Sequence, residues 1–138
     1  MQGKTISEIK VGDKAEFTKT VTETDIALFA GVTGDQNPVH MNEEWAKKTR
    51  FGGRIAHGML SAGLISGVVG MYLPGPGTIY VSQEIRFLAP IHIGDTITAQ
   101  VTVEELLQDK NRARLKTRCL NQNGVTVVDG TAWVMPPK

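Results

Sequence analysis

The sequence predicts an α+β fold in which an antiparallel sheet of about five strands curls round one long, uncharged helix. The run from residue 58 to residue 73 contains no charged residue and has apolar residues on every helical face. Such a helix is typical of a buried position, and it is shorter than the roughly 20 apolar residues that a membrane span requires. After the break at Pro74-Gly75-Pro76-Gly77 the pattern changes to twofold alternation. We therefore expect this helix at the centre of the fold, with strands wrapped around it.

Three segments of the second half of the chain, residues 79–88, 97–104 and 112–119, alternate between apolar and polar residues, which predicts half-buried strands. A fourth strand is expected over residues 125–134. In the first segment, the expected inward set is Ile79, Val81, Ile85 and Phe87. The stretch from Asn121 to Gly124 is typical of a turn between the last two strands.

The first part of the chain predicts one strand and one helix. Residues 15–21 place Ala15, Phe17 and Val21 on one side of a strand. Thr22 or Thr24 is suited to cap the helix that follows, and Gly34 is suited to end it.

Residues 35–40 follow that helix. Pro38 keeps Asn37 out of helical geometry, so we expect an ordered, irregular loop here. Asn42 is suited to cap a short helix over residues 43–48.

Composition and charge favour one ordinary globular domain over residues 1–138. The formal net charge is +1, which argues against general binding to nucleic acid or to an anionic membrane. The single cysteine, Cys119, has no partner for an internal disulfide, and the first ten residues lack an apolar signal core. We therefore expect a cytoplasmic protein.

The candidate chemistry lies in the loop before the central helix. Asp35 and His40 are five positions apart, with the amide of Asn37 between them. A carboxylate and an imidazole held by a proline-stiffened turn form a pair able to bind and activate one water molecule, with Asp35 as the base and His40 as its acid partner. Spacing alone leaves this open, because these residue types are also common in turns.

We expect no metal site and no redox cofactor. Asp35 and His40 supply only two ligands, and the other candidate ligands, His57, His92 and Cys119, show no ligand-like spacing to them. No glycine-rich dinucleotide fingerprint follows a predicted strand. His57 is expected to orient the loop or cap the helix.

The start of the central helix is the second candidate element. Gly58 lacks a side chain and follows His57, so free backbone N–H groups are expected to point beyond the helix terminus. Such an end favours negative charge.

Several segments resemble the MaoC-like, hydratase 2 group of (R)-specific enoyl-CoA hydratases. The segment from Phe29 to His40 with Ala46, and the block from Ala56 to Gly67, are similar to the group's signature. Leu73-Pro74-Gly75 with Gly77, and Phe87 to Asp95, extend the likeness over nearly the whole chain. The resemblance implies a hot dog fold, in which a curved antiparallel sheet wraps a long central helix.

The same resemblance implies roles for individual residues. Asp35 and His40 match the catalytic pair, and Asn37 matches a support for their loop. Gly58 matches the position whose backbone N–H holds the thioester oxygen, and Ser66 is similar to a helix residue close to the reacting centre.

The implied reaction is the reversible syn hydration of a trans-2-enoyl-CoA to a (3R)-3-hydroxyacyl-CoA, a step of fatty-acid metabolism. The expected partners are an acyl-CoA substrate, with an acyl carrier protein as the less favoured alternative, and a second copy of the chain in a homodimer. The order of proton transfers within the pair of Asp35 and His40 stays open.

Two other functions remain possible at this point. A thioesterase of the same fold would attack the carbonyl with water, and a non-catalytic module would only bind acyl thioesters. The basic residues Lys110, Arg112, Arg114, Lys116 and Arg118 follow one strand face. We interpret them as a solvated face, with phosphates of CoA or an acidic carrier protein as the alternative.

Overall fold

The computed structural model describes all 138 residues and contains five strands, four α-helices and two short 3₁₀ turns. In chain order the elements are η1 (Ile6–Glu8), β1 (Lys14–Thr20), α1 (Glu23–Thr33), α2 (Pro38–Met41), α3 (Glu43–Ala46), α4 (Gly58–Met71), β2 (Ile79–Phe87), β3 (Thr96–Leu107), η2 (Gln108–Lys110), β4 (Arg112–Leu120) and β5 (Thr126–Met135). All five predicted strands and the predicted long helix are present. No helix has the length and apolar character needed to cross a membrane.

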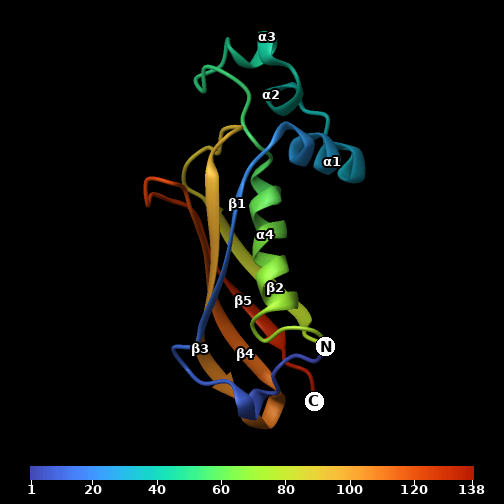
Figure 1. The fold of residues 1–138 in the computed structure, drawn as a ribbon, viewed down its shortest axis with the longest axis vertical. Helices are drawn as coiled ribbons and strands as arrows, with labels where there is room; N and C mark the ends of the chain where they lie inside the picture. The colour runs from blue at the N-terminus through green and yellow to red at the C-terminus, as the bar shows by residue number, and fades with distance from the viewer.

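The strands form a single antiparallel sheet in the order β1-β3-β4-β5-β2. The sheet is curved, and α4 runs along its concave side, while α1, α2 and α3 gather beyond one end of α4 (Figure 1). This arrangement confirms the predicted α+β architecture. It also places the segment between α1 and α4, where the candidate residues lie, at one end of the molecule.

The core lies between α4 and the three central strands. Ile65 and Val68 of α4 are fully buried, as are Val101 of β3, Leu115 of β4 and Ala132 of β5. Twofold alternation therefore predicts the inward faces of β3 and β4 correctly, because each of these strands has a neighbour on both sides and one face against the helix.

Only one side of α4 is covered, which corrects the expectation that the rest of the chain wraps it. Met59 and Met71 are 55% and 52% exposed, and a Cβ added at Gly63 or Gly67 would meet no atom within 4 Å. A five-stranded sheet curls round one side of a helix and leaves the other side open. The apolar residues on every face of this helix are therefore not all buried within one chain.

The inward set predicted for β2 is wrong at two of its four positions. Ile79 and Val81 are 58% and 49% exposed. Ile85 packs against the core, and Phe87, although 52% exposed, lies against Gly58 at the start of α4. The register of β2 on β5 shifts between Tyr80 and Ser82, so the alternation changes face at this irregularity. β2 is also an edge strand, with a neighbour on one side only.

Candidate active site

The end of α1 positions Asp35. Thr22 caps α1 through a bond from the Asp25 N–H to its hydroxyl at 3.2 Å, and Gly34 ends the helix in the left-handed conformation with φ of 78°. Both termini were predicted from the sequence. The left-handed geometry, which glycine adopts without strain, turns the chain so that Asp35 leaves the helix axis.

Asn37 braces the chain between the two candidate catalytic residues. Its side-chain oxygen accepts from the Val39 N–H at 3.2 Å, and its own N–H donates to the Asp35 carboxylate at 3.2 Å. Asn37 is non-helical, as predicted, but the following residues form helix α2 rather than an irregular loop. The reason is that Pro38 at the first helical position and Asn37 at the cap together favour a helix start. His40 therefore lies on a short helix.

His40 is buried and neutral, with one ring nitrogen available as an acceptor. Its Nδ1 lies 2.8 Å from the carbonyl oxygen of Ile55, and because a carbonyl only accepts, Nδ1 carries the proton. The Nε2 atom therefore holds the lone pair. Burial lowers the pKa of His40 below its ordinary value of 6.5, because the effect of burial on the charged ring is larger than the opposing effect of the hydrogen bond to Ile55.

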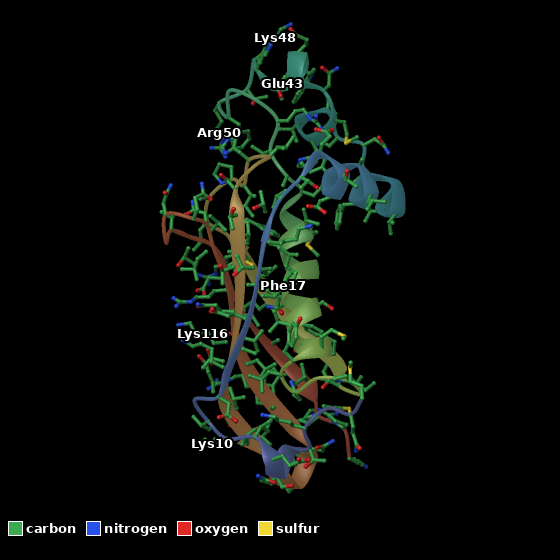
Figure 2. All side chains as sticks on the ribbon, viewed as in Figure 1. Lys10, Phe17, Glu43, Lys48, Arg50 and Lys116 are labelled. Atoms are coloured by element: carbon green, nitrogen blue, oxygen red, sulfur yellow. The ribbon has the colours of Figure 1, made fainter.

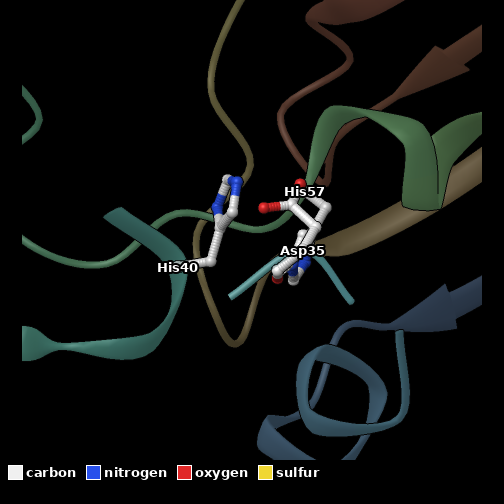
Figure 3. A group of neighbouring side chains, drawn as sticks. All are labelled: Asp35, His40 and His57. Carbon is white, nitrogen blue, oxygen red and sulfur yellow. Dashed lines mark hydrogen bonds between the residues drawn. The ribbon is translucent and has the colours of Figure 1, made fainter. Parts of the chain in front are cut away.

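His57 lies beside the two predicted catalytic residues. One ligand-type atom from each of Asp35, His40 and His57 lies within 4.8 Å of the others, and Figure 3 shows the three side chains close together near the start of α4. The His57 Nε2–H donates to the backbone oxygen of Asp35 at 2.9 Å. The ring is only 1% exposed and its centroid lies 4.0 Å from that of His40. Of its two expected roles, the structure shows loop orientation and no side-chain cap.

Arg54 is a second supporting residue that sequence reasoning missed. Its Nε donates to the backbone oxygen of His40 at 2.5 Å, and its two terminal nitrogens donate to the carboxylate of Glu23 at 2.9 and 2.8 Å. The guanidinium thus joins α1, α2 and the loop before α4. No local pattern marks such a role, because its partners lie 14 and 31 positions away in the sequence.

The N-terminus of α4 presents free donors, as predicted. The N–H groups of Gly58 and Met59 donate to no atom of the protein. A Cβ at Gly58 would lie 2.8 Å from two atoms of the Phe87 ring, so the backbone passes close to this ring and only glycine fits without a shift. The free N–H groups and the helix dipole together favour a negatively charged oxygen at this end.

These groups share one cavity of about 600 Å³. Its wall contains Phe29, Thr33, Asp35, His40, Arg50, Phe51, Ile55, Ala56, His57, Gly58, Met59, Ser61, Phe87, Leu88, Ala89, Pro90, Ile91 and Val128. Most of this wall is apolar, which is typical of a site for a hydrophobic ligand with a few polar groups at its reacting part. The structure therefore brings Asp35, His40 and Gly58 to one cavity.

Two predicted residues lie outside the cavity wall. Asn37 acts behind it, through the hydrogen bonds described above. Ser66 is exposed on the uncovered side of α4 and does not line the cavity of the single chain. Ser61, one turn after Gly58, is the helix serine in the wall, where its hydroxyl is buried without a partner. Residues five positions apart lie on different sides of a helix, but only the packed structure shows which of the two serines faces the cavity.

A curved sheet on a central helix, with a carboxylate and an imidazole beside a free helix terminus, is the architecture of hot dog hydratases. The chain belongs to the MaoC-like family: the model described as "MaoC like domain" matches residues 6–126. It is 52% identical to the (R)-specific enoyl-CoA hydratase of Rhodospirillum rubrum, over 94% of this chain and 90% of the relative.

Solved structures agree with this assignment. The unliganded R-hydratase PhaJ1 of Pseudomonas aeruginosa superposes with a TM-score of 0.94 at 49% identity, covering 99% of this chain and 88% of that one. The (R)-hydratase of Aeromonas caviae involved in PHA biosynthesis gives a TM-score of 0.91 at 42% identity, covering 94% and 98%. The predicted family and the predicted hot dog fold are therefore confirmed.

Proposed function

We propose that this protein is an (R)-specific enoyl-CoA hydratase, a hydro-lyase that adds water reversibly to a trans-2-enoyl-CoA and forms a (3R)-3-hydroxyacyl-CoA. The similarity to the Rhodospirillum rubrum and Aeromonas caviae enzymes supports the substrate class. The observation that carries the proposal is the free Nε2 lone pair of neutral His40 beside the Asp35 carboxylate, at a cavity that also contains the free N–H of Gly58.

Asp35 and His40 act on one water molecule. Both present acceptors, so both are able to take a hydrogen bond from the water that attacks C3. Because neutral His40 has no proton on Nε2 to donate, the proton added at C2 is the one that the water releases. One proton leaves the water for the pair as the C3–O bond forms, and the pair then returns it to C2. His40 is therefore an acceptor first and a donor second, whereas the sequence favours the donor's role and leaves the order of proton transfers open.

Gly58 stabilises the charge that the reaction builds. Attack at C3 moves electrons onto the thioester oxygen, which becomes an enolate oxygen. An N–H at the start of α4 is free to donate to that oxygen, and the helix dipole acts in the same direction. A donor of this kind in a site protected from water is commonly worth about 3 kcal/mol in transition-state stabilisation.

The proposed reaction uses no metal and no other cofactor. Asp35, His40 and His57 are close enough to hold a metal ion. However, a hydrogen bond from Gly58 already polarises the carbonyl, and the pair already activates water. Dialysis against a strong chelator should therefore leave the hydration rate unchanged, while a loss that Zn²⁺ or Mg²⁺ restores would contradict this part of the proposal.

A homodimer is part of the proposal. The edge strand β2 exposes Ile79 and Val81, and the uncovered side of α4 exposes Met59 and Met71. An apolar edge strand and an adjoining apolar helix face are typical of a surface that a second copy covers. Pairing β2 with the partner's β2 would extend the sheet across both chains and bury these side chains.

The proposal places the enzyme in the cytoplasm, which suits a buried, unpaired Cys119.

A turnover assay separates this proposal from the two alternatives. Crotonyl-CoA should lose its enoyl absorbance and yield (3R)-3-hydroxybutyryl-CoA by chiral analysis. Release of free CoA thiol at a comparable rate would support the thioesterase. Binding of C4 to C12 trans-2-enoyl-CoAs without turnover would support the non-catalytic module.

A further inference from the structure

Arg50 is the one permanent cation in the wall of the cavity. Among the wall residues, only Asp35 and Arg50 carry a full charge at neutral pH when the histidines are neutral. Arg50 is exposed, whereas His57 and Ser61 in the same wall are buried. Asp35, Met59, Phe87 and Leu88 of the wall are exposed as well, so the opening is bordered by several residues, and Arg50 is the cation among them. Arg50 lies on the loop that leads from α3 to α4 (Figure 2).

The charge of Arg50 is not used within the protein. No carboxylate lies within ion-pair distance of its guanidinium, whereas the nearby Arg54 pairs with Glu23, and Lys47 pairs with Glu44. The guanidinium carbon lies 4.9 Å from the centroid of the Phe51 ring, which also lines the cavity. A cation held over an aromatic ring keeps its N–H groups free for an anion.

The basic face of the sheet is not an alternative site for the same anion. Lys116 lies on the side of the sheet away from α4, as Figure 2 shows. On the same strand, Arg114 lies 3.6 and 3.5 Å from the carboxylates of Glu104 and Glu105, and Arg118 donates to Gln100 at 2.7 Å. None of these residues lines the cavity. This agrees with the sequence-based interpretation of a solvated face.

We infer that Arg50 binds the phosphates of coenzyme A and thereby selects CoA thioesters. The inference rests on the proposed function, because that function places the thioester inside the cavity at Asp35 and His40. The acyl end must then lie within the apolar cavity, and the nucleotide end must remain at the opening. Arginine is well suited to phosphate through paired N–H donors and a permanent charge.

Calorimetric binding of free CoA and of pantetheine, which has no phosphate, tests the inference without any turnover. Arg50→Gln should raise the Kd for CoA by about tenfold, the scale of one lost charge-assisted contact, and should lower the preference for CoA over pantetheine by the same factor. The matched control is Lys48→Gln, which removes the same charge from an exposed residue outside the cavity wall and should leave that preference intact. Raising the salt concentration should weaken CoA binding by the parent more than CoA binding by Arg50→Gln.

Three results would overturn the inference: no measurable binding of CoA by the parent, an unchanged preference in Arg50→Gln, or an equal loss in Lys48→Gln. The ratio of kcat/KM for crotonyl-CoA to that for crotonyl-pantetheine gives the same comparison during turnover. If CoA binds and depends on Arg50 but neither thioester is hydrated, the proposed function fails and the phosphate site stands. If both are hydrated with the same ratio in parent and Arg50→Gln, only the phosphate site fails.

Discussion

The Nε2–H of His57 donates to the backbone oxygen of Asp35 at 2.9 Å, and this bond joins the residue before α4 to the second residue after α1. It also fixes the His57 tautomer, because the carbonyl oxygen can only accept. The bond therefore holds Asp35 beside His40 through its backbone, and the Asp35 carboxylate remains available to the substrate water. The bond makes His57 a positioning residue for the catalytic pair.

Replacing His57 by Phe should slow hydration by about fivefold. The variant keeps a ring of similar size but loses the bond to Asp35, and a typical hydrogen bond contributes about 1 kcal/mol. The effect should fall on kcat more than on KM, because the position of the attacking water changes while the Phe ring preserves the shape of the cavity wall. Steady-state kinetics with crotonyl-CoA measures both values.

His92→Phe is the matched control, because His92 lies outside the cavity wall and loses the same imidazole. It should hydrate crotonyl-CoA at the parent rate. An unchanged kcat in His57→Phe would show that Asp35 is held by Asn37 and the α1 terminus alone.

Replacing Gly58 by Ala should lower the hydration rate by at least tenfold, chiefly by moving the start of α4. The added Cβ would lie 2.8 Å from the Phe87 ring, so the helix terminus or the ring must shift. Phe87→Leu in the same chain should recover part of the loss, because it removes the colliding ring and leaves the N–H of residue 58 in place.

The comparison of Gly58→Ala alone, Phe87→Leu alone and the double variant isolates this collision. A double variant no faster than Gly58→Ala would mean that the added methyl blocks the substrate itself. Thermal melts of all three separate a catalytic loss from an unfolded protein.

The hydration rate should stay constant through pH 6.5 and fall only at lower pH. The lowered pKa of His40 keeps the ring neutral and able to accept the water proton at pH values where an ordinary histidine is half protonated. His40 also contributes to stability in its neutral form. That contribution is complete above 6.5 and is lost as the pH falls from 6.5 through the folded-state pKa. A profile of kcat/KM against pH, with an NMR titration of His40, checks the prediction, and a half-maximal rate at or above pH 6.5 would contradict it.

The protein should be a dimer at assay concentration, and Val81→Glu should weaken that dimer. Val81 is 49% exposed on the edge strand β2, where a carboxylate in the partner's interface would be unfavourable. Val11→Glu is the matched control, because Val11 is a 61% exposed valine in a turn away from β2. Light scattering should give a monomer, or a mixture, for Val81→Glu alone. A parent that is monomeric and fully active would defeat the dimer proposal.

The sequence predicts those features that depend on residues near one another in the chain. An uncharged run predicts α4, alternation predicts β3 and β4, the turn at residues 121–124 predicts the return into β5, and the caps at Thr22 and Gly34 bound α1. Asp35 and His40 are identifiable for the same reason, since they are only five positions apart.

Local sequence patterns do not predict contacts between distant segments. Arg54 supports the site through the backbone oxygen of His40, and local sequence does not mark this role. For His57 the sequence predicts a loop-orienting role but not its partner, the backbone oxygen of Asp35. The irregularity in β2 leaves Ile79 and Val81 facing outward, and no residue type in the strand predicts it. Ser61 and Ser66 are five residues apart on one helix, and the choice between them depends on where the cavity forms against α4.

The central claim is that Asp35 and His40 act together on one water molecule, and a double-mutant cycle tests it most directly. Asp35→Asn keeps the size of the side chain but removes the carboxylate, and His40→Ala removes the lone pair on Nε2. Each should lower the rate of crotonyl-CoA hydration by about a hundredfold or more, which is the usual scale for a general acid–base group. Thermal melts should show both variants folded.

Because both residues serve one step, the double variant should be scarcely slower than the slower single variant, whereas independent defects would multiply. The measurement is therefore the hydration rate of the parent, both single variants and the double variant under one set of conditions. The account predicts two large losses that do not multiply. A folded Asp35→Asn variant with a rate close to that of the parent would contradict it.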